Sequence, residues 1–226
     1  MFYFDPTFLL LIPAILVTLY AQYRVQATFA KYSSVQAKSG RTAGQVARLI
    51  LDEVGLASIP INQVAGNLTD NYDPRDKTLH LSEPVYNSTS VAAIGVAAHE
   101  AGHAIQDAKA YAPLALRRNL VPVAGLGSQL AIPLFFMGMI FSMPILMDVG
   151  IIAFSLAVAF TAITLPVEFN ASARAIKVLS GHGYLTEDEV PMARSVLNAA
   201  ALTYLASAAM AVMNLLRLII LRGQRD

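Results

Sequence analysis

Four stretches without a charged residue divide the chain, and each is rich in apolar side chains. They cover residues 6–23, 119–147, 149–167 and 195–216. A helix needs about 20 apolar residues to cross a hydrocarbon core about 30 Å thick. We therefore predict four transmembrane helices, at about 7–23, 120–142, 148–167 and 197–220. The first run is the shortest, and its alternative is a buried core helix. Because no basic residue precedes it, we expect an uncleaved anchor rather than a signal peptide.

The polar stretches between these runs have helix and strand patterns of their own. Val46, Leu49, Ile50 and Val54 recur at helical spacing behind Thr42, which is a typical helix N-cap residue. This pattern predicts a helix that begins just after residue 42.

Two strands and a second helix are predicted farther along. Residues 59–64 favour a short strand, and residues 67–76 are rich in turn-forming Asn, Asp, Pro and Gly. Residues 78–81 alternate polar and apolar side chains, which is typical of a strand. Ser90 is a suitable N-cap for a helix over about 90–108.

The stretch 182–194 has the pattern of a loop that opens a helix. Thr186 is a suitable cap, and Glu189 stands three residues later, at the capping-box position. We therefore expect the acidic residues here to serve the helix terminus rather than a metal.

The composition supports a membrane protein and excludes several other classes. Hydrophobic residues make up 56% and charged residues 14% of the 226 residues, and the mean hydropathy is +0.54. Soluble domains have about 25% charged residues. A net charge of +1 gives no basic field for nucleic acid. Because cysteine is absent, any metal site must use His, Asp or Glu.

The distribution of basic residues predicts the orientation. Ten of the sixteen Lys and Arg residues lie in 24–119 and three in 168–194. The positive-inside rule places both segments in the cytoplasm and the N-terminus outside. Four spans would then put the C-terminal tail outside as well, although it carries Arg217, Arg222 and Arg225. The side of the tail therefore stays open.

One motif in the predicted helix 90–108 carries chemistry. His99, Glu100 and His103 form the pattern His-Glu-x-x-His. Residues four apart on a helix lie on one face, so both imidazoles can reach one cation. Zinc binds neutral imidazole and, in catalytic sites, keeps a position for water, whose pKa it lowers. Glu100 would act as the general base for that metal-activated water.

A third protein ligand must come from elsewhere in the chain. Glu168 is the best candidate, because it directly follows an uncharged transmembrane run, on the same predicted side of the membrane as the motif. An acidic side chain at the end of a membrane span is energetically unfavourable, so its presence there indicates a function. The rival ligands are His80, Asp148 and His182. Asp107, one turn beyond His103, is a candidate to orient a ligand.

The chain resembles the bacterial membrane neutral zinc metallopeptidases of YugP type over nearly its whole length. The resemblance rests on residues 99–106, on Tyr-Asp-Pro at 72–74, on Leu-Ser-Glu-Pro-Val-Tyr at 81–86 and on Glu-Phe-Asn-Ala-Ser at 168–172. More distantly, the site is similar to the gluzincin plan of the heat-shock protease HtpX and the CAAX-prenyl endoproteases, with the third ligand in a Glu-x-x-Ala-Asp pattern.

The resemblance implies a mainly α fold: an integral membrane helical bundle with a small α+β, zincin-like region that holds the motif helix and a short edge strand. It implies one Zn²⁺ per chain, bound by His99, His103 and Glu168. In the distant plan an Asp orients a ligating His, and here Ser172 replaces it. The implied location is the bacterial inner membrane, and the implied partners are the lipid bilayer and a protein or peptide substrate.

The resemblance also suggests residues that contact the substrate. Zincins commonly bind peptide along an edge strand before the metal helix, which gives the strand 78–81, with Thr78, Leu79 and His80, that role. An oxyanion stabiliser is also needed. The polar candidates are His80, Arg174 and Tyr204.

These expectations divide the chain into five segments. They are an N-terminal anchor (1–23), the metallopeptidase region (24–119), two transmembrane helices (120–167), a helix with the third ligand and a polar loop (168–194), and a last transmembrane helix with its tail (195–226). The predicted function is a membrane-bound zinc endopeptidase with its site at the cytoplasmic membrane surface. The alternatives are an intramembrane site-2-type protease and a non-enzymatic zinc-binding scaffold.

Overall fold

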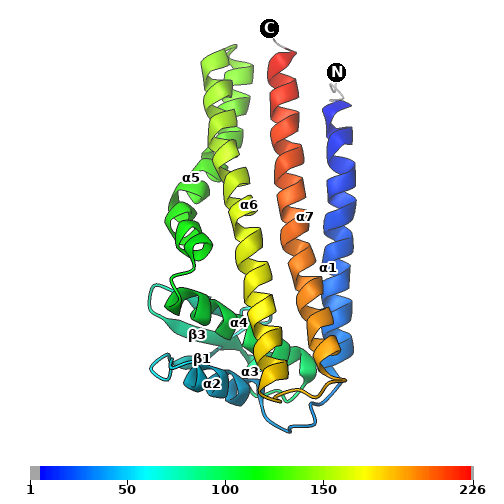
Figure 1. Ribbon diagram of the computed structural model, residues 1–226. Coiled ribbons are helices and arrows are strands. Elements are labelled where there is room, and N and C mark those ends of the chain that lie inside the picture. Colours follow the sequence, from blue (N-terminus) through cyan, green and yellow to red (C-terminus); the bar gives the residue numbers. More distant parts are fainter. Residues whose placement is uncertain (1–5, 225–226) are drawn as a thin grey trace. The chain divides into compact units, whose positions relative to one another are not determined.

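The computed structural model describes residues 6–224 and is mainly helical (Figure 1), which confirms the predicted fold class. Residues 1–5 and 225–226, at the ends of the predicted anchor and tail, lie outside the described residues. The long helices are α1 (Ile12–Ser33, preceded by the 3₁₀ turn η1, Pro6–Leu11), α5 (Ala112–Ile140), α6 (Pro144–Gly181) and α7 (Val190–Gly223). The shorter elements are α2 (Ala43–Glu53), β1 (Ile61–Val64), β2 (Asn71–Asp73), β3 (Thr78–Ser82), α3 (Glu83–Tyr86) and α4 (Val91–Ala108).

The described chain divides into two compact units. Unit 1 comprises residues 6–22, 115–165 and 203–224, and unit 2 comprises residues 23–114 and 166–202. The division falls inside α1, α5, α6 and α7, so each of these four helices contributes residues to both units.

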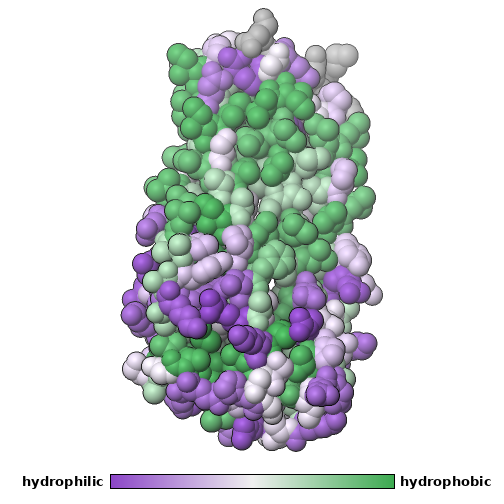
Figure 2. All heavy atoms as spheres, viewed as in Figure 1, coloured by the Kyte–Doolittle hydropathy of each residue, from purple (hydrophilic) through white to green (hydrophobic). Residues whose placement is uncertain are grey.

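A helix is present at each of the four predicted transmembrane spans, and each helix is longer than the span predicted for it. All four are long and apolar enough to cross a membrane. Large apolar side chains are exposed on the helices of unit 1, as the hydropathy colouring of Figure 2 shows; among them are Leu16, Leu126, Ile140, Ile145 and Ile152. Such a surface is stable against lipid tails and unfavourable in water.

Small residues let α5 and α6 approach closely within unit 1. A Cβ on Gly127 would lie 3.0 Å from the Ala153 carbonyl oxygen, and one on Gly150 would lie 2.8 Å from that of Ala131. The fully buried Phe135 packs beside this contact. This is the small-residue packing that membrane helices use in place of a hydrophobic driving force.

Unit 2 contains a three-stranded sheet in the order β1-β3-β2. β1 pairs parallel to β3, with Ile61 opposite Leu79, and β2 pairs antiparallel to β3, with Tyr72 opposite Leu79. The strand predicted at 78–81 is therefore confirmed, but its predicted edge position is wrong. β3 has a partner on each side, so it has no free backbone edge for a peptide. The strand β2 arises inside the stretch predicted as turns.

Apolar side chains buried between the sheet and α4 hold this helix in position. Leu79 and Leu81 are fully buried and belong to one core with Ile50 of α2, Ile94 of α4 and Leu179 of α6. The local signals at the helix starts are those predicted. The amide of Ala93 donates to Ser90 Oγ at 3.2 Å, and Thr42 forms a capping box with Gln45.

Glu189 serves the start of α7, as expected. Its carboxylate accepts the backbone N–H of Thr186 at 2.8 Å and that of Lys38 at 2.7 Å. It is 2% exposed. The carboxylate therefore fixes the loop before α7 onto the segment that follows α1.

Helix α6 continues well past the predicted span of 148–167. Ala171, Ala175 and Leu179 are buried at four-residue spacing, so one face of the extension packs into the core of unit 2. Glu168 therefore lies within a continuous helix rather than at the end of one.

Candidate metal centre

His99 and His103 lie one turn apart on α4, on the same side of the helix. Their ring centroids are 4.8 Å apart and the ring planes are nearly perpendicular, at 86°. Ser90 sets the start of this helix, and the register that follows turns both imidazoles toward α6. Both belong to unit 2.

Glu168 meets both histidines from α6. Its Oε2 lies 3.2 Å from His99 Nε2 and 3.6 Å from His103 Nε2, and Glu168 is 2% exposed. The helices can approach because residue 102 is glycine. A Cβ there would lie 2.7 Å from the carbonyl oxygen of Ala171, three residues beyond Glu168.

The three side chains form a donor set that suits zinc. Two imidazole nitrogens and one carboxylate oxygen lie within 4.8 Å of one another. Two imidazoles and a carboxylate are ligands that Zn²⁺ takes in catalytic sites. Among the described residues, no other group of three His, Asp or Glu side chains meets this criterion.

The rival third ligands have other partners. His182 Nδ1 lies 2.9 Å from the carboxylate of Glu53, and Asp148 accepts a hydrogen bond of 2.8 Å from Arg222 Nε. His80 is absent from the ligand group as well. The structure therefore brings only Glu168, of the four candidates, to the two histidines.

The second ring nitrogen of each histidine also has a partner. His99 Nδ1 lies 3.1 Å from Ser172 Oγ, where the resemblance placed an orienting residue. His103 Nδ1 lies 3.0 Å from Gln106 Oε1. Asp107 instead accepts a 3.0 Å hydrogen bond from the hydroxyl of Tyr72. The structure thus places Gln106, and not Asp107, beside the ligand His103.

Gln106 is a residue that sequence reasoning missed. It is fully buried, on the helix face that also carries His99 and His103. A polar side chain on such a face, three residues after a ligand, was the available signal. Its partners on α6 are 61 and 64 residues away, so the sequence alone did not identify them.

Glu100 lies beside the ligands and touches the sheet. Its Oε2 accepts the backbone N–H of Tyr72 at 3.0 Å. Glu100 is 9% exposed. Because Tyr72 is in the edge strand β2, this hydrogen bond ties the carboxylate to the sheet and leaves Oε1 without a part in that contact.

The pKa values of His103 and of the neighbouring Tyr72 are both raised. Burial lowers the pKa of the His103 imidazole, but the hydrogen bond and charge of Glu168, the charge of Glu100 and the hydrogen bond to Gln106 outweigh it. The pKa of His103 therefore lies above its ordinary value of 6.5. Burial, and next the hydrogen bond to Asp107, raise the pKa of the Tyr72 hydroxyl, which stays protonated at neutral pH.

The predicted substrate-contacting residues are spread over several places. Thr78 and Leu79 are buried in the central strand, and Leu79 belongs to the core. His80 has a buried Nδ1 without a hydrogen-bond partner among the described residues. Arg174 Nε donates to Asn170 Oδ1 at 2.7 Å. Tyr204 belongs to unit 1. The central position of β3 removes the predicted edge-strand role of Thr78 and Leu79. Contacts of His80, Arg174 and Tyr204 with a substrate stay predictions.

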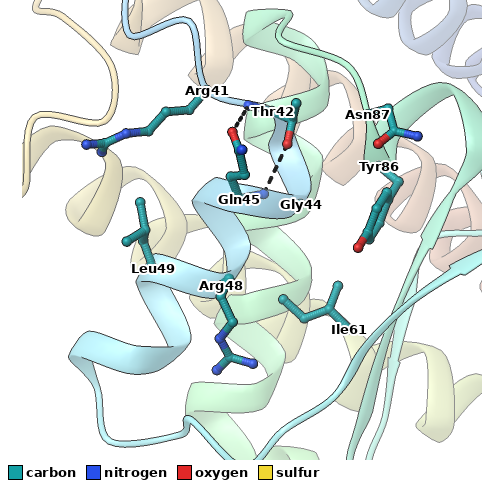
Figure 3. Close-up of a pocket in the computed structure, with 9 residues that line it drawn as sticks. All are labelled: Arg41, Thr42, Gly44, Gln45, Arg48, Leu49, Ile61, Tyr86 and Asn87. Atoms are coloured by element: carbon teal, nitrogen blue, oxygen red, sulfur yellow. Dashed lines mark hydrogen bonds between the residues drawn. The ribbon is translucent and has the colours of Figure 1, made fainter.

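A hollow elsewhere in unit 2 has a different character (Figure 3). It has a volume of about 800 Å³. Its lining consists of Arg41, Thr42, Gly44, Gln45, Arg48, Leu49, Ile61, Tyr86 and Asn87. None of these is a predicted site residue. Arg48 is engaged by Asp52 at 2.8 Å, and the Arg41 guanidinium lies 5.8 Å from the ring centroid of Tyr184.

The fold and the site together combine four helices that are long and apolar enough to cross a membrane with a His-His-Glu group that could hold a metal ion. Residues 7–223 match the family described as "Putative neutral zinc metallopeptidase", and the chain belongs to that family. It is 46% identical over 212 residues to the "Putative membrane protease YugP" of Bacillus subtilis (strain 168), a match that covers 94% of each chain. No solved structure matches the chain.

Proposed function

We propose that the protein is a zinc-dependent endopeptidase of the membrane, with one zinc per chain held by His99, His103 and Glu168. The observation that carries this proposal is the convergence of these three ligands beside the carboxylate of Glu100. The family supports the reaction class, and the donor set supports the metal.

The residues of the chain have distinct parts in this proposal. When bound, a zinc ion lowers the pKa of a water molecule and polarises a peptide carbonyl. Glu100 takes up the proton of the attacking water and passes it to the nitrogen of the leaving amine. The hydrogen bond from the Tyr72 amide holds Glu100 Oε2 in place, which leaves Oε1 to accept the proton.

The proposed substrate is a protein or peptide at the cytoplasmic surface of the membrane. The polar segments 24–119 and 168–194 together carry thirteen of the sixteen Lys and Arg residues, which favours a cytoplasmic location for both. These segments also contain all three ligands and Glu100. A site there can reach loops and termini of membrane proteins.

The variant Glu100→Gln tests this assignment. In detergent-purified protein, we expect casein cleavage to fall by about 10²–10⁴-fold, the range that a general base contributes, while bound zinc stays at the wild-type level. Glu187→Gln, the same change at an exposed glutamate, is the matched control and should leave both unchanged. Cleavage by Glu100→Gln at the wild-type rate would show that Glu100 is not the base.

A further inference from the structure

The amide of Gln106 is held in one orientation by its surroundings on α6. Gln106 Nε2 lies 2.8 Å from the backbone carbonyl oxygen of Val167 and 3.0 Å from Asn170 Oδ1. A backbone carbonyl can only accept a hydrogen bond, so the Gln106 group that faces Val167 must be the NH₂ donor. The opposite end of the amide, Oε1, then faces His103.

Asn170 enforces the same orientation independently. Its Oδ1 accepts a 2.7 Å hydrogen bond from Arg174 Nε, and a guanidinium can only donate. The atom of Asn170 that faces Gln106 is therefore an acceptor as well. Two acceptors of different origin, one backbone and one side chain, both require the Gln106 amide nitrogen on their side.

This orientation determines which nitrogen of His103 carries the proton. Gln106 Oε1 lies 3.0 Å from His103 Nδ1 and offers only an acceptor. A neutral His103 therefore carries its hydrogen on Nδ1 and has its lone pair on Nε2, the nitrogen that faces Glu168 at 3.6 Å. A metal ligand needs that lone pair.

The partner of Nδ1 in the other histidine imposes no such constraint. His99 Nδ1 lies 3.1 Å from Ser172 Oγ, and a hydroxyl can donate or accept. Ser172 therefore holds the ring of His99 without selecting its tautomer. The two histidine ligands therefore differ: Gln106 selects the tautomer of His103, and Ser172 does not select that of His99. Ser172 is also the residue that replaces the Asp of the distant gluzincin pattern.

We propose that Gln106 is a positioning residue for the metal site: anchored by Val167 and Asn170, it fixes the tautomer and ring orientation of His103 so that Nε2 is ready to bind zinc. Arg174 supports it through Asn170. The inference rests on the proposed function for the zinc site itself, and it adds a role for Gln106, Asn170 and Arg174. Partners that orient a ligating histidine typically change metal affinity by 10–100-fold when mutated.

The test compares zinc affinity, measured by chelator competition in detergent, between wild type and Gln106→Met. Methionine has a similar length and fills the buried space but accepts no hydrogen bond from Nδ1–H. We expect about a 10–100-fold loss of zinc affinity and a changed absorption spectrum of the cobalt-substituted protein. Gln63→Met, the same change at an exposed glutamine of β1, is the control and should change neither.

Two further variants separate positioning from packing. Gln106→Glu keeps an acceptor for His103 Nδ1, so it should lose less zinc affinity than Gln106→Met. A role in packing alone predicts at least as large a loss, because a carboxylate would face the carbonyl of Val167. Asn170→Ala leaves Gln106 in place and should cause a smaller loss than Gln106→Met. It also serves as the test if Gln106→Met does not fold.

The outcomes distinguish this inference from the proposed function. If Gln106→Met binds zinc as tightly as wild type, the role of Gln106 is overturned and the zinc site stands. If Gln106→Met does not fold, the same result in Asn170→Ala overturns that role. Wild-type protein that binds no zinc would overturn both.

Discussion

The close contact at Gly102 makes a sharp prediction about the site. Adding a methyl group there, in Gly102→Ala, would put Cβ 2.7 Å from the carbonyl oxygen of Ala171, and the backbone of α6 gives it no flexible side chain to displace. Ordinary contact begins at 3.4 Å, so α4 and α6 must separate by about 0.7 Å at this point. His103 is adjacent in sequence to Gly102, and Glu168 is one turn from Ala171 on α6.

The magnitude follows from two opposing effects. Alanine stabilises a helix interior by about 1 kcal/mol relative to glycine. Overpacking a buried contact costs about 1–3 kcal/mol, so the free energy of unfolding should fall by up to about 2 kcal/mol. Zinc ligands must lie within about 0.2 Å of their ideal distances, so a separation of about 0.7 Å should also weaken zinc binding.

Gly95→Ala is a matched control on the same helix. Its Cβ would lie 3.4 Å from the Cβ of Ala193, an ordinary contact, so this variant should be as stable as wild type or up to about 1 kcal/mol more stable. Both variants are measured by chemical denaturation and by chelator competition for zinc. Wild-type stability and zinc affinity in Gly102→Ala would refute the argument that the glycine permits the approach of α4 and α6.

Two further predictions concern the pH dependence of the site and a helix cap. Because the pKa of His103 is raised above 6.5, its contribution to the stability of zinc-free protein is fully present below pH 6.5 and is lost as pH rises through the folded-state pKa. The unfolding midpoint of zinc-free protein should therefore fall over that window, while zinc affinity, which needs the neutral imidazole, should rise; a midpoint that does not fall would contradict this. Thr42→Ala removes the hydroxyl oxygen that accepts a 3.2 Å hydrogen bond from the backbone N–H of Gln45. The free energy of unfolding, measured by denaturant titration, should fall by about 1 kcal/mol, and zinc binding should stay unchanged.

The elements set by local signals were predictable from the sequence. The helix expected at about 90–108 is observed at Val91–Ala108, because Ser90 caps it and its apolar pattern is continuous. The apolar runs identified all four long helices. The apolar runs did not give the helix ends, because hydropathy marks only the apolar part of a helix. Helix α6 continues into the polar region, where its buried alanines pack against unit 2.

The pairing of strands and the polar contacts of the site depended on distant residues. The composition around residues 71–73 predicts a turn, but these residues form the strand β2 because they pair with β3. The same pairing makes β3 central rather than an edge strand. The choice between Gln106 and Asp107 as the partner of His103 was likewise set by α6, whose Val167 carbonyl holds the amide of Gln106.

The most direct test of the central claim is the zinc content of detergent-purified wild type and of Glu168→Gln, which keeps the size of the side chain and removes its charge. The account predicts one zinc per chain in wild type, and a sharp loss of zinc and of casein cleavage in Glu168→Gln. Wild-type zinc content in the variant would contradict Glu168 as the third ligand, and with it the proposed site.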